Sequence, residues 1–118
     1  MNSIDPKPKE VWLVNWDWDQ VGTEIGKPRP AIVVGKDVPF NTSMRIVLPI
    51  TTWQEKFKNM VWMFHLSNQT TQFLINDSAV NTYQIKCYDI QRFQKRLVDA
   101  IDEKDFDNTI NLAKFWLS

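Results

Sequence analysis

The sequence has few of the side chains on which many enzymes rely: its 118 residues include one cysteine, Cys87, and one histidine, His65. A lone cysteine excludes an intramolecular disulfide and a cysteine-based zinc site, and a lone histidine excludes mechanisms that use a histidine pair within one chain. Net charge is absent, because 14 basic residues balance 14 acidic ones. No apolar run approaches the roughly 18 residues of a membrane span, and no signal-peptide core is present. We therefore expect a cytoplasmic protein with no membrane partner.

What the sequence does have is material for a folded core. Hydrophobic residues make up 43% of the chain and include six Trp and seven Phe, which excludes a disordered linker. The length fits one domain, which we place at residues 1–118 with an exposed lead-in at 1–9. Residues 1–98 hold twelve basic and nine acidic groups, whereas 99–118 hold two and five, so a basic body with an acidic C-terminal element is predicted.

Alternation along the chain predicts a mainly β (α+β) fold. Trp12, Val14, Trp16 and Trp18 recur at every second residue and predict a strand over 11–18. Pro49 cannot donate a ladder hydrogen bond, so it indicates an edge or a bulge. We expect a small twisted antiparallel barrel with one C-terminal helix. Its further strands are predicted at 31–34, 44–52, 61–66, 79–87 and 97–101, and the helix is predicted to be capped by Asp102 and to bury Phe106, Ile110, Ala113 and Leu117.

Most residues that could carry chemistry have an ordinary structural explanation. His65 lies within an apolar strand pattern with no partner at metal or triad spacing, so a structural histidine is favoured over a catalytic one. Cys87 follows the same logic, because a lone cysteine in a strand usually packs in a core. The tryptophans at 12, 16 and 18 could stack nucleobases, but core packing is the favoured interpretation.

Arg29 is harder to explain in this way. It lies between Pro28 and Pro30, which fix two φ angles and push Arg29 toward an extended conformation. A guanidinium held like this is a preorganised phosphate clamp, because it is planar and always charged. The alternative is an arginine in a surface turn. Thr51 and Thr52 offer hydroxyls at the end of a strand, although a threonine pair in a strand is common by itself.

Four motifs, in their order along the chain, resemble the MazF/PemK (Kid) toxin family. They are Val11-Trp12-Leu13-Val14, Gly22-Thr23-Glu24, Lys27-Pro28-Arg29-Pro30-Ala31-Ile32-Val33-Val34 and Val47-Leu48-Pro49-Ile50-Thr51-Thr52. Downstream, the resemblance continues through Ser78, Val80, Gln84-Ile85-Lys86, Asp89 and Arg92, so it extends from about residue 10 to the end.

This resemblance implies a toxin of a type II toxin–antitoxin system on an SH3-like barrel. It implies a homodimeric endoribonuclease that needs no metal or other cofactor, cuts single-stranded RNA, and leaves a 2′,3′-cyclic phosphate and a 5′-hydroxyl. A cognate antitoxin with an acidic, disordered tail is expected to compete for the same groove. The resemblance assigns catalytic roles to Arg29, Thr51 and Glu24, and we expect contacts with RNA from Thr23, Lys27, Thr52, Gln84 and Lys86.

One departure and two other functions stay open. Tyr83 stands where some members of the family carry an acidic residue, which removes one candidate acid or base. Trp116 lies near the end of the chain, and CcdB-type gyrase poisons, which share the fold, act through a C-terminal tryptophan. A non-catalytic SH3-like binding module is the third possibility.

Overall fold

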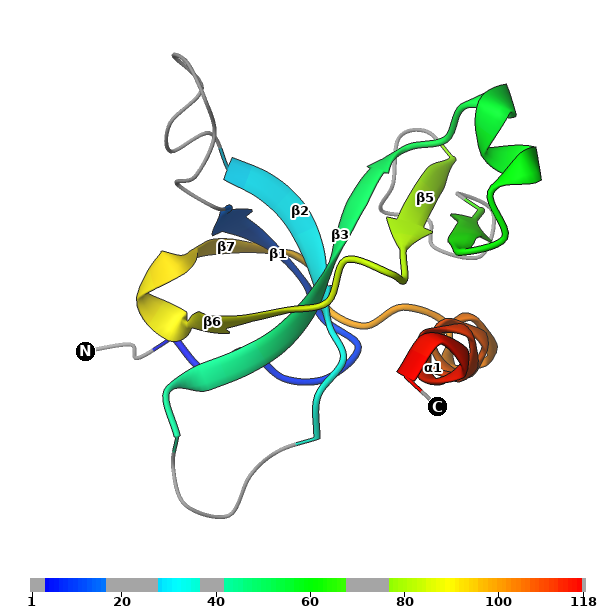
Figure 1. Ribbon diagram of the computed structural model, residues 1–118. Helices are drawn as coiled ribbons and strands as arrows, with labels where there is room; N and C mark the ends of the chain where they lie inside the picture. The colour runs from blue at the N-terminus through cyan, green and yellow to red at the C-terminus, as the bar shows by residue number, and fades with distance from the viewer. Residues whose placement is uncertain (1–3, 17–27, 37–41, 68–76, 118) are drawn as a thin grey trace.

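The described residues form seven strands and one long helix. The computed structural model describes residues 4–16, 28–36, 42–67 and 77–117. The helix α1 spans Glu103–Leu117, and two short 3₁₀ helices, η1 (Glu55–Asn59) and η2 (Ile90–Arg92), interrupt the strands (Figure 1). The strands are β1 (Val11–Asn15), β2 (Pro28–Val33), β3 (Met44–Thr52), β4 (Met63–Leu66), β5 (Ser78–Asn81), β6 (Lys86–Asp89) and β7 (Phe93–Val98).

All neighbouring strands are antiparallel, in the order β4-β5-β3-β2-β1-β7, with β6 also paired to β3. The nine-residue β3 joins the two parts, because its first half pairs with β6 and its last three residues pair with β5. The sheet curls into a barrel-like shape, although pairing among the described residues does not close a full ring (Figure 1). The mainly β fold with a C-terminal helix is confirmed.

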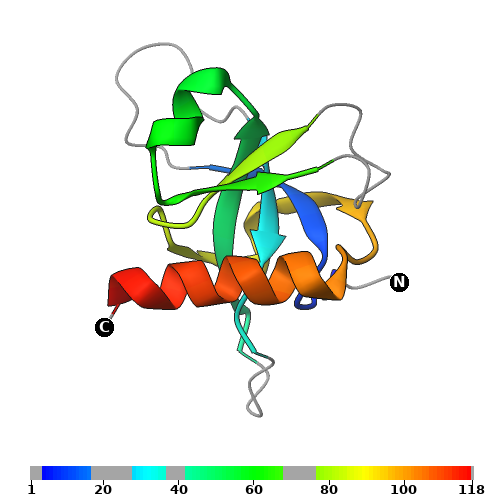
Figure 2. The ribbon, with the colours of Figure 1, turned by 90° about the vertical axis from the view of Figure 1, so that its right-hand side faces the viewer.

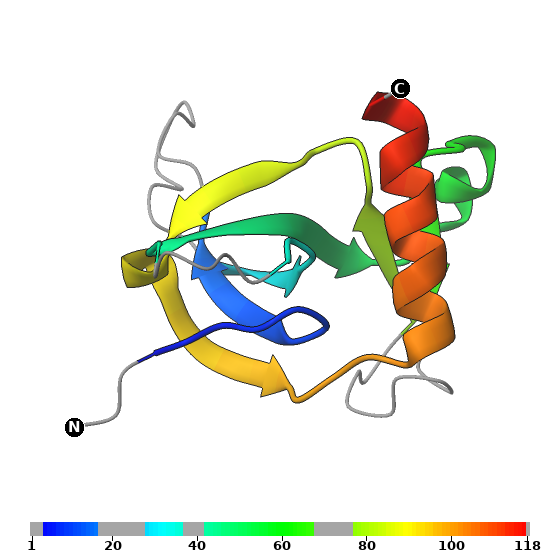
Figure 3. The same ribbon diagram turned by 90° about the horizontal axis from the view of Figure 1, so that it is seen from below.

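The hydrophobic core lies on both faces of this sheet. One cluster fills the inside of the curl and includes Trp12, Val14 and Trp16, as the alternation of β1 predicts. The other cluster, around Leu48 and Val80, lies between the sheet and α1. Figures 2 and 3 show α1 lying across the outside of the barrel, beside β5. The predicted strand residue Trp18 lies outside the described residues.

The cap of α1 is confirmed, but one predicted core position is wrong. The Asp102 carboxylate accepts the backbone N–H groups of Lys104 and Asp105 at 3.1 and 3.3 Å. Leu117, expected on the buried face, is 73% exposed because it lies in the last turn, past the edge of the sheet. Thr109 is fully buried instead, and its hydroxyl donates to the backbone carbonyl of Asp105 at 2.8 Å, which satisfies it inside the helix.

Three predictions about strands and the lead-in are corrected. The predicted strand at 79–87 is two strands, β5 and β6, separated by a turn that begins at Asn81. The weakly predicted strand at 97–101 begins earlier, at Phe93. The lead-in is not uniformly exposed: Pro6 is fully buried, and the backbone of Lys9 bonds to both Val33 and Ile101, so this segment packs against the sheet.

Pro49 lies inside the sheet rather than at an edge. It pairs with Ala31 of β2, and on its other side it falls between Val47, the last residue paired to β6, and Ile50, the first paired to β5. A residue without an N–H is tolerated here because the ladder changes partner at this point. The predicted irregularity is therefore real, and it lies where β3 leaves one strand and joins another.

A carboxylate fixes the far end of β6. Asp89 accepts the backbone N–H of Gln91 at 2.9 Å and the Ser43 hydroxyl at 2.7 Å, so it joins η2 to the segment that precedes β3. The N–H of Gln91, followed by the Ser43 hydroxyl, lowers the pKa of Asp89 from its usual value. The carboxylate is therefore charged, and this cap present, at neutral pH.

Candidate active site

Arg29 stands at the exposed start of β2. Its neighbour across the ladder is Val14 of β1, whereas pairing with β3 begins only at Ala31. The two flanking prolines therefore occupy positions where β2 has one partner strand, and they hold the backbone of Arg29 extended. Within the described part of the chain, the guanidinium of Arg29 has no hydrogen-bond or ion-pair partner. An always-charged fork is thus left open to a ligand.

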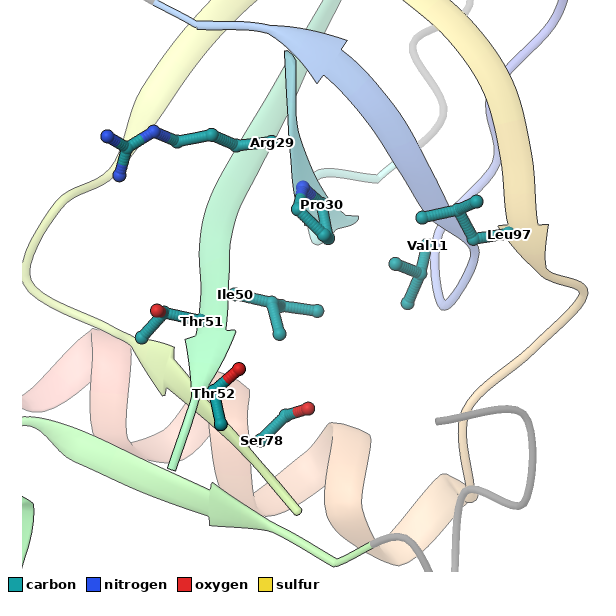
Figure 4. A pocket seen from close by; sticks show the side chains of 8 residues that line it. All are labelled: Val11, Arg29, Pro30, Ile50, Thr51, Thr52, Ser78 and Leu97. Atoms are coloured by element: carbon teal, nitrogen blue, oxygen red, sulfur yellow. The ribbon is translucent and has the colours of Figure 1, made fainter. Parts of the chain in front are cut away.

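Thr51, near the end of β3, lines the same hollow as Arg29. Thr51 and Thr52 are both exposed, and their neighbours on β5 are Ala79 and Ser78. Arg29 and the two threonines line a hollow of about 320 Å³, whose floor is formed by apolar side chains (Figure 4). Its lining consists of Val11, Arg29, Pro30, Ile50, Thr51, Thr52, Ser78 and Leu97.

A second hollow, of about 240 Å³, lies on the other side of the same pair. Arg29 and Thr51 line both hollows, so they stand between them. The second hollow combines aromatic and thioether side chains with two amides, those of Asn81 and Gln84. Its lining consists of Arg29, Pro49, Ile50, Thr51, Phe57, Met60, Trp62, Met63, Asn81 and Gln84.

The structure thus brings together four of the residues predicted for the site. Arg29 and Thr51 lie at its centre, Thr52 in the first hollow and Gln84 in the second. Lys86 is not among the described residues that line either hollow; it lies on β6, opposite Val47. Three predicted residues, Thr23, Glu24 and Lys27, lie outside the described residues.

Of the two amides that line the second hollow, Gln84 is predicted from the sequence and Asn81 is not. Asn81 was assigned to the middle of a strand, but its Oδ1 accepts the backbone N–H of Tyr83 at 3.1 Å and forms a turn. That turn brings Gln84 beside Asn81, whose Nδ2 donates to its Oε1 at 3.4 Å. Asn81-Thr82 was the available signal, since asparagine favours such turns. Tyr83 itself is 69% exposed and makes an edge contact with Trp116, with ring centroids 6.1 Å apart.

The lone cysteine and the lone histidine of the sequence are both exposed. Cys87 is an exposed free thiol on β6. His65 lies on β4 with 45% of its side chain exposed, and its Nε2 is 3.1 Å from Asp77 Oδ2. The alternation of β4 places Leu66, rather than His65, in the core. The predicted core position of Cys87 is therefore wrong, whereas His65, in contact with Asp77, fits the structural role predicted for it.

The described residues hold neither a metal-binding cluster nor a membrane-spanning helix. Across residues 4–16, 28–36, 42–67 and 77–117, no three side chains of His, Cys, Asp or Glu come together in a way that could hold a metal ion. Among the same residues, no helix has the length and apolar character to cross a bilayer.

A family comparison decides between the sequence interpretations. The model of the PemK-like, MazF-like toxin of type II toxin–antitoxin systems matches residues 7–114. The chain belongs to this family. The match spans the barrel and nearly all of α1, so the resemblance seen in the four sequence motifs extends over almost the whole chain.

Solved structures of MazF proteins share the fold of this MazF/PemK family toxin. MazF (Form-I) from Deinococcus radiodurans superposes with a TM-score of 0.69 at 18% identity, over 98% of each chain. The MazE-MazF complex (Form-III) from the same organism superposes with a TM-score of 0.67 at 17% identity, over 98% of this chain and 97% of that one. Mycobacterium tuberculosis toxin MazF-mt6 superposes with a TM-score of 0.63 at 15% identity, over 90% of this chain and 96% of that one. No curated protein matches the sequence.

Proposed function

We propose that this toxin is a metal-independent endoribonuclease that cleaves single-stranded RNA, with Arg29 and Thr51 at the reacting phosphate. The observation that carries the proposal is the position of this pair: a guanidinium without a partner among the described residues and an exposed hydroxyl stand between two hollows. A chain that passes through both hollows would place a phosphate at the pair and a nucleotide on each side.

The reaction needs only groups of this kind. The 2′-oxygen of the ribose attacks the adjacent phosphorus, the bond from phosphorus to the 5′-oxygen breaks, and a 2′,3′-cyclic phosphate remains. Because the nucleophile belongs to the substrate, the enzyme has to align it and stabilise the charge on the phosphoryl oxygens. Arg29 neutralises that charge and the Thr51 hydroxyl donates one hydrogen bond to it. Glu24 is our candidate to accept the 2′-OH proton, since arginine is a poor base, and the leaving 5′-oxygen takes up a proton to end as a hydroxyl.

The second hollow has the chemistry of a base-binding site. Unpaired bases are recognised by stacking on aromatic rings and by hydrogen bonds along their edges. Trp62 and Phe57 supply the rings, and Gln84 and Asn81 supply the amides. Because Asn81 already donates to Gln84 Oε1, the Nε2 group of Gln84 is left to donate to a base.

The test is to incubate the protein with a long RNA in EDTA, beside an Arg29→Ala control. We expect discrete fragments from the wild type alone, since no step uses a metal. Activity that vanished in EDTA and returned with magnesium would contradict the mechanism. A gyrase–DNA cleavage complex without RNA fragments would indicate a gyrase poison. If neither RNA fragments nor a gyrase–DNA complex formed, the protein would be a non-catalytic binding module.

The contacts of Trp116 do not favour the gyrase alternative. Its indole N–H donates to the hydroxyl of Thr82 at 3.2 Å, and that fully buried hydroxyl donates to the Trp62 carbonyl at 2.6 Å. The polar group of this tryptophan is therefore used inside the fold, where it joins α1 to the wall of the second hollow.

We further propose that the toxin forms a homodimer and binds a cognate antitoxin. Exposed large apolar side chains, among them Tyr83, Phe115 and Leu117, support an interface. Two similar structures support an antitoxin partner. One is the MazE-MazF complex, and the other is an endoribonuclease in complex with its cognate antitoxin from a mycobacterial species. The latter superposes with a TM-score of 0.64 at 15% identity, over 92% of this chain and 90% of that one. Light scattering of the toxin alone at micromolar concentration checks the first proposal, and a 14.0 kDa species would contradict it. We expect the antitoxin to compete with RNA for the same groove. If an excess of non-cleavable RNA left the affinity for the antitoxin unchanged, this expectation would be wrong.

A further inference from the structure

Beside the proposed site, three rings form a column that the proposed reaction does not use. The imidazole of His65 stacks on the indole of Trp53, with centroids 4.2 Å apart and planes 11° from parallel. Phe57 contacts the same indole edge-on, with centroids 5.7 Å apart. Phe57 also lines the second hollow, so the column begins at the wall of that hollow and ends at His65.

The strand register places this column on the face of Thr51. Thr51 lies opposite Ala79, and Ala79 lies opposite His65, so the three side chains project from one face of the sheet. Two strand spacings, about 10 Å, separate the backbones of Thr51 and His65. Trp53 follows Thr51 by two residues, so the column lies beside the proposed scissile phosphate, within reach of a neighbouring nucleotide.

Asp77 holds both stacked rings in place. Its carboxylate Oδ2 is 3.1 Å from His65 Nε2, and its backbone carbonyl accepts the backbone N–H of Trp53 at 3.0 Å. One face of the imidazole is covered by the indole, yet 45% of the His65 side chain is exposed. The open area therefore belongs to the parts of the side chain that the indole does not cover. A flat, fixed ring with one open face is what a nucleobase needs for stacking.

We propose that His65 and Trp53 form a stacking platform for a base of the RNA outside the cleaved dinucleotide. The base extends the column by one ring, on the outer face of His65, and Asp77 is a positioning residue. This inference rests on the proposed function, since it assumes RNA as the substrate. An RNA is favoured over the antitoxin as occupant because the exposed imidazole is linked through Trp53 to Phe57, which lines the proposed base-binding hollow.

The test measures the affinity of a long, fully 2′-O-methylated RNA, which cannot be cleaved, for the wild type and for His65→Ala. We expect Kd to rise about five- to tenfold, the low end of what one base–aromatic stack contributes. In cleavage of unmodified long RNA, KM should rise by a similar factor with kcat unchanged. A dinucleotide-length substrate, which lacks the stacked base, should give equal KM for both proteins.

Two further variants separate stacking from a structural role. His65→Phe keeps a ring and loses the bond to Asp77, so we expect affinity near that of the wild type. His65→Asn keeps a polar group but has no ring, so it should resemble His65→Ala. The inference is overturned if His65→Ala binds long RNA as tightly as the wild type, if short and long substrates weaken equally, or if only antitoxin affinity falls. RNA binding that depends on His65 in a protein that does not cleave would refute the proposed function and keep the platform; no RNA binding at all would refute both.

Discussion

Replacing Arg29 by alanine is expected to lower kcat/KM for RNA by at least about a hundredfold, since removal of one preorganised group that stabilises transition-state charge costs that much or more. Arg29 is exposed and has no partner within the described chain, so the loss should come without a change in thermal stability. The measurement is cleavage of a defined RNA by both proteins, with a melting curve of each.

Arg29→Lys is the matched control for charge. Lysine keeps the positive charge but lacks the planar fork that donates to two phosphoryl oxygens at once. We expect activity between those of the wild type and Arg29→Ala. An alanine variant that cleaved within a few-fold of the wild-type rate, while folded, would remove Arg29 from the reacting phosphate.

Thr51→Ala should produce the second large effect. Loss of a hydrogen bond made to the developing charge lowers kcat, and typical single-donor deletions cost about a hundredfold or more. KM should change little, because the bond strengthens in the transition state. Thr51→Ser restores the hydroxyl, so it should restore most of kcat.

The neighbouring Thr52 provides a control on the same strand. Thr52 lines the first hollow only, so Thr52→Ala should affect KM more than kcat. Equal losses of kcat in Thr51→Ala and Thr52→Ala, or full activity of folded Thr51→Ala, would show that the phosphate does not react at Thr51, between the two hollows.

Local patterns predicted much of this fold. The alternation of Trp12, Val14 and Trp16 and the cap at Asp102 depend on neighbours in sequence, and both are confirmed. The errors occurred where distant segments decide the outcome. The ladder of β3 changes partner at Pro49, and the turn at Asn81 divides the segment 79–87, which the sequence predicts as one strand.

The same distinction applies to the site. Arg29 was predictable because its flanking prolines signal a fixed backbone, and Thr51 because of its motif. The second hollow depends on η1, β4 and the turn after β5 meeting in space, which no local spacing reveals. The partners of His65 could not be predicted, because Trp53 and Asp77 each lie 12 residues away in the sequence and the pairing of β5 with both β3 and β4 brings them together.

The central claim is that the RNA supplies its own nucleophile while Arg29 and Thr51 stabilise the phosphate. The most direct measurement uses one RNA with a single 2′-deoxy nucleotide on the 5′ side of the cleaved bond, in EDTA, beside its all-ribose counterpart. The account predicts no cleavage at the deoxy position, and a 2′,3′-cyclic phosphate and a 5′-hydroxyl at the ribose position. Cleavage of the deoxy substrate, or a 5′-phosphate on the downstream fragment, would contradict it.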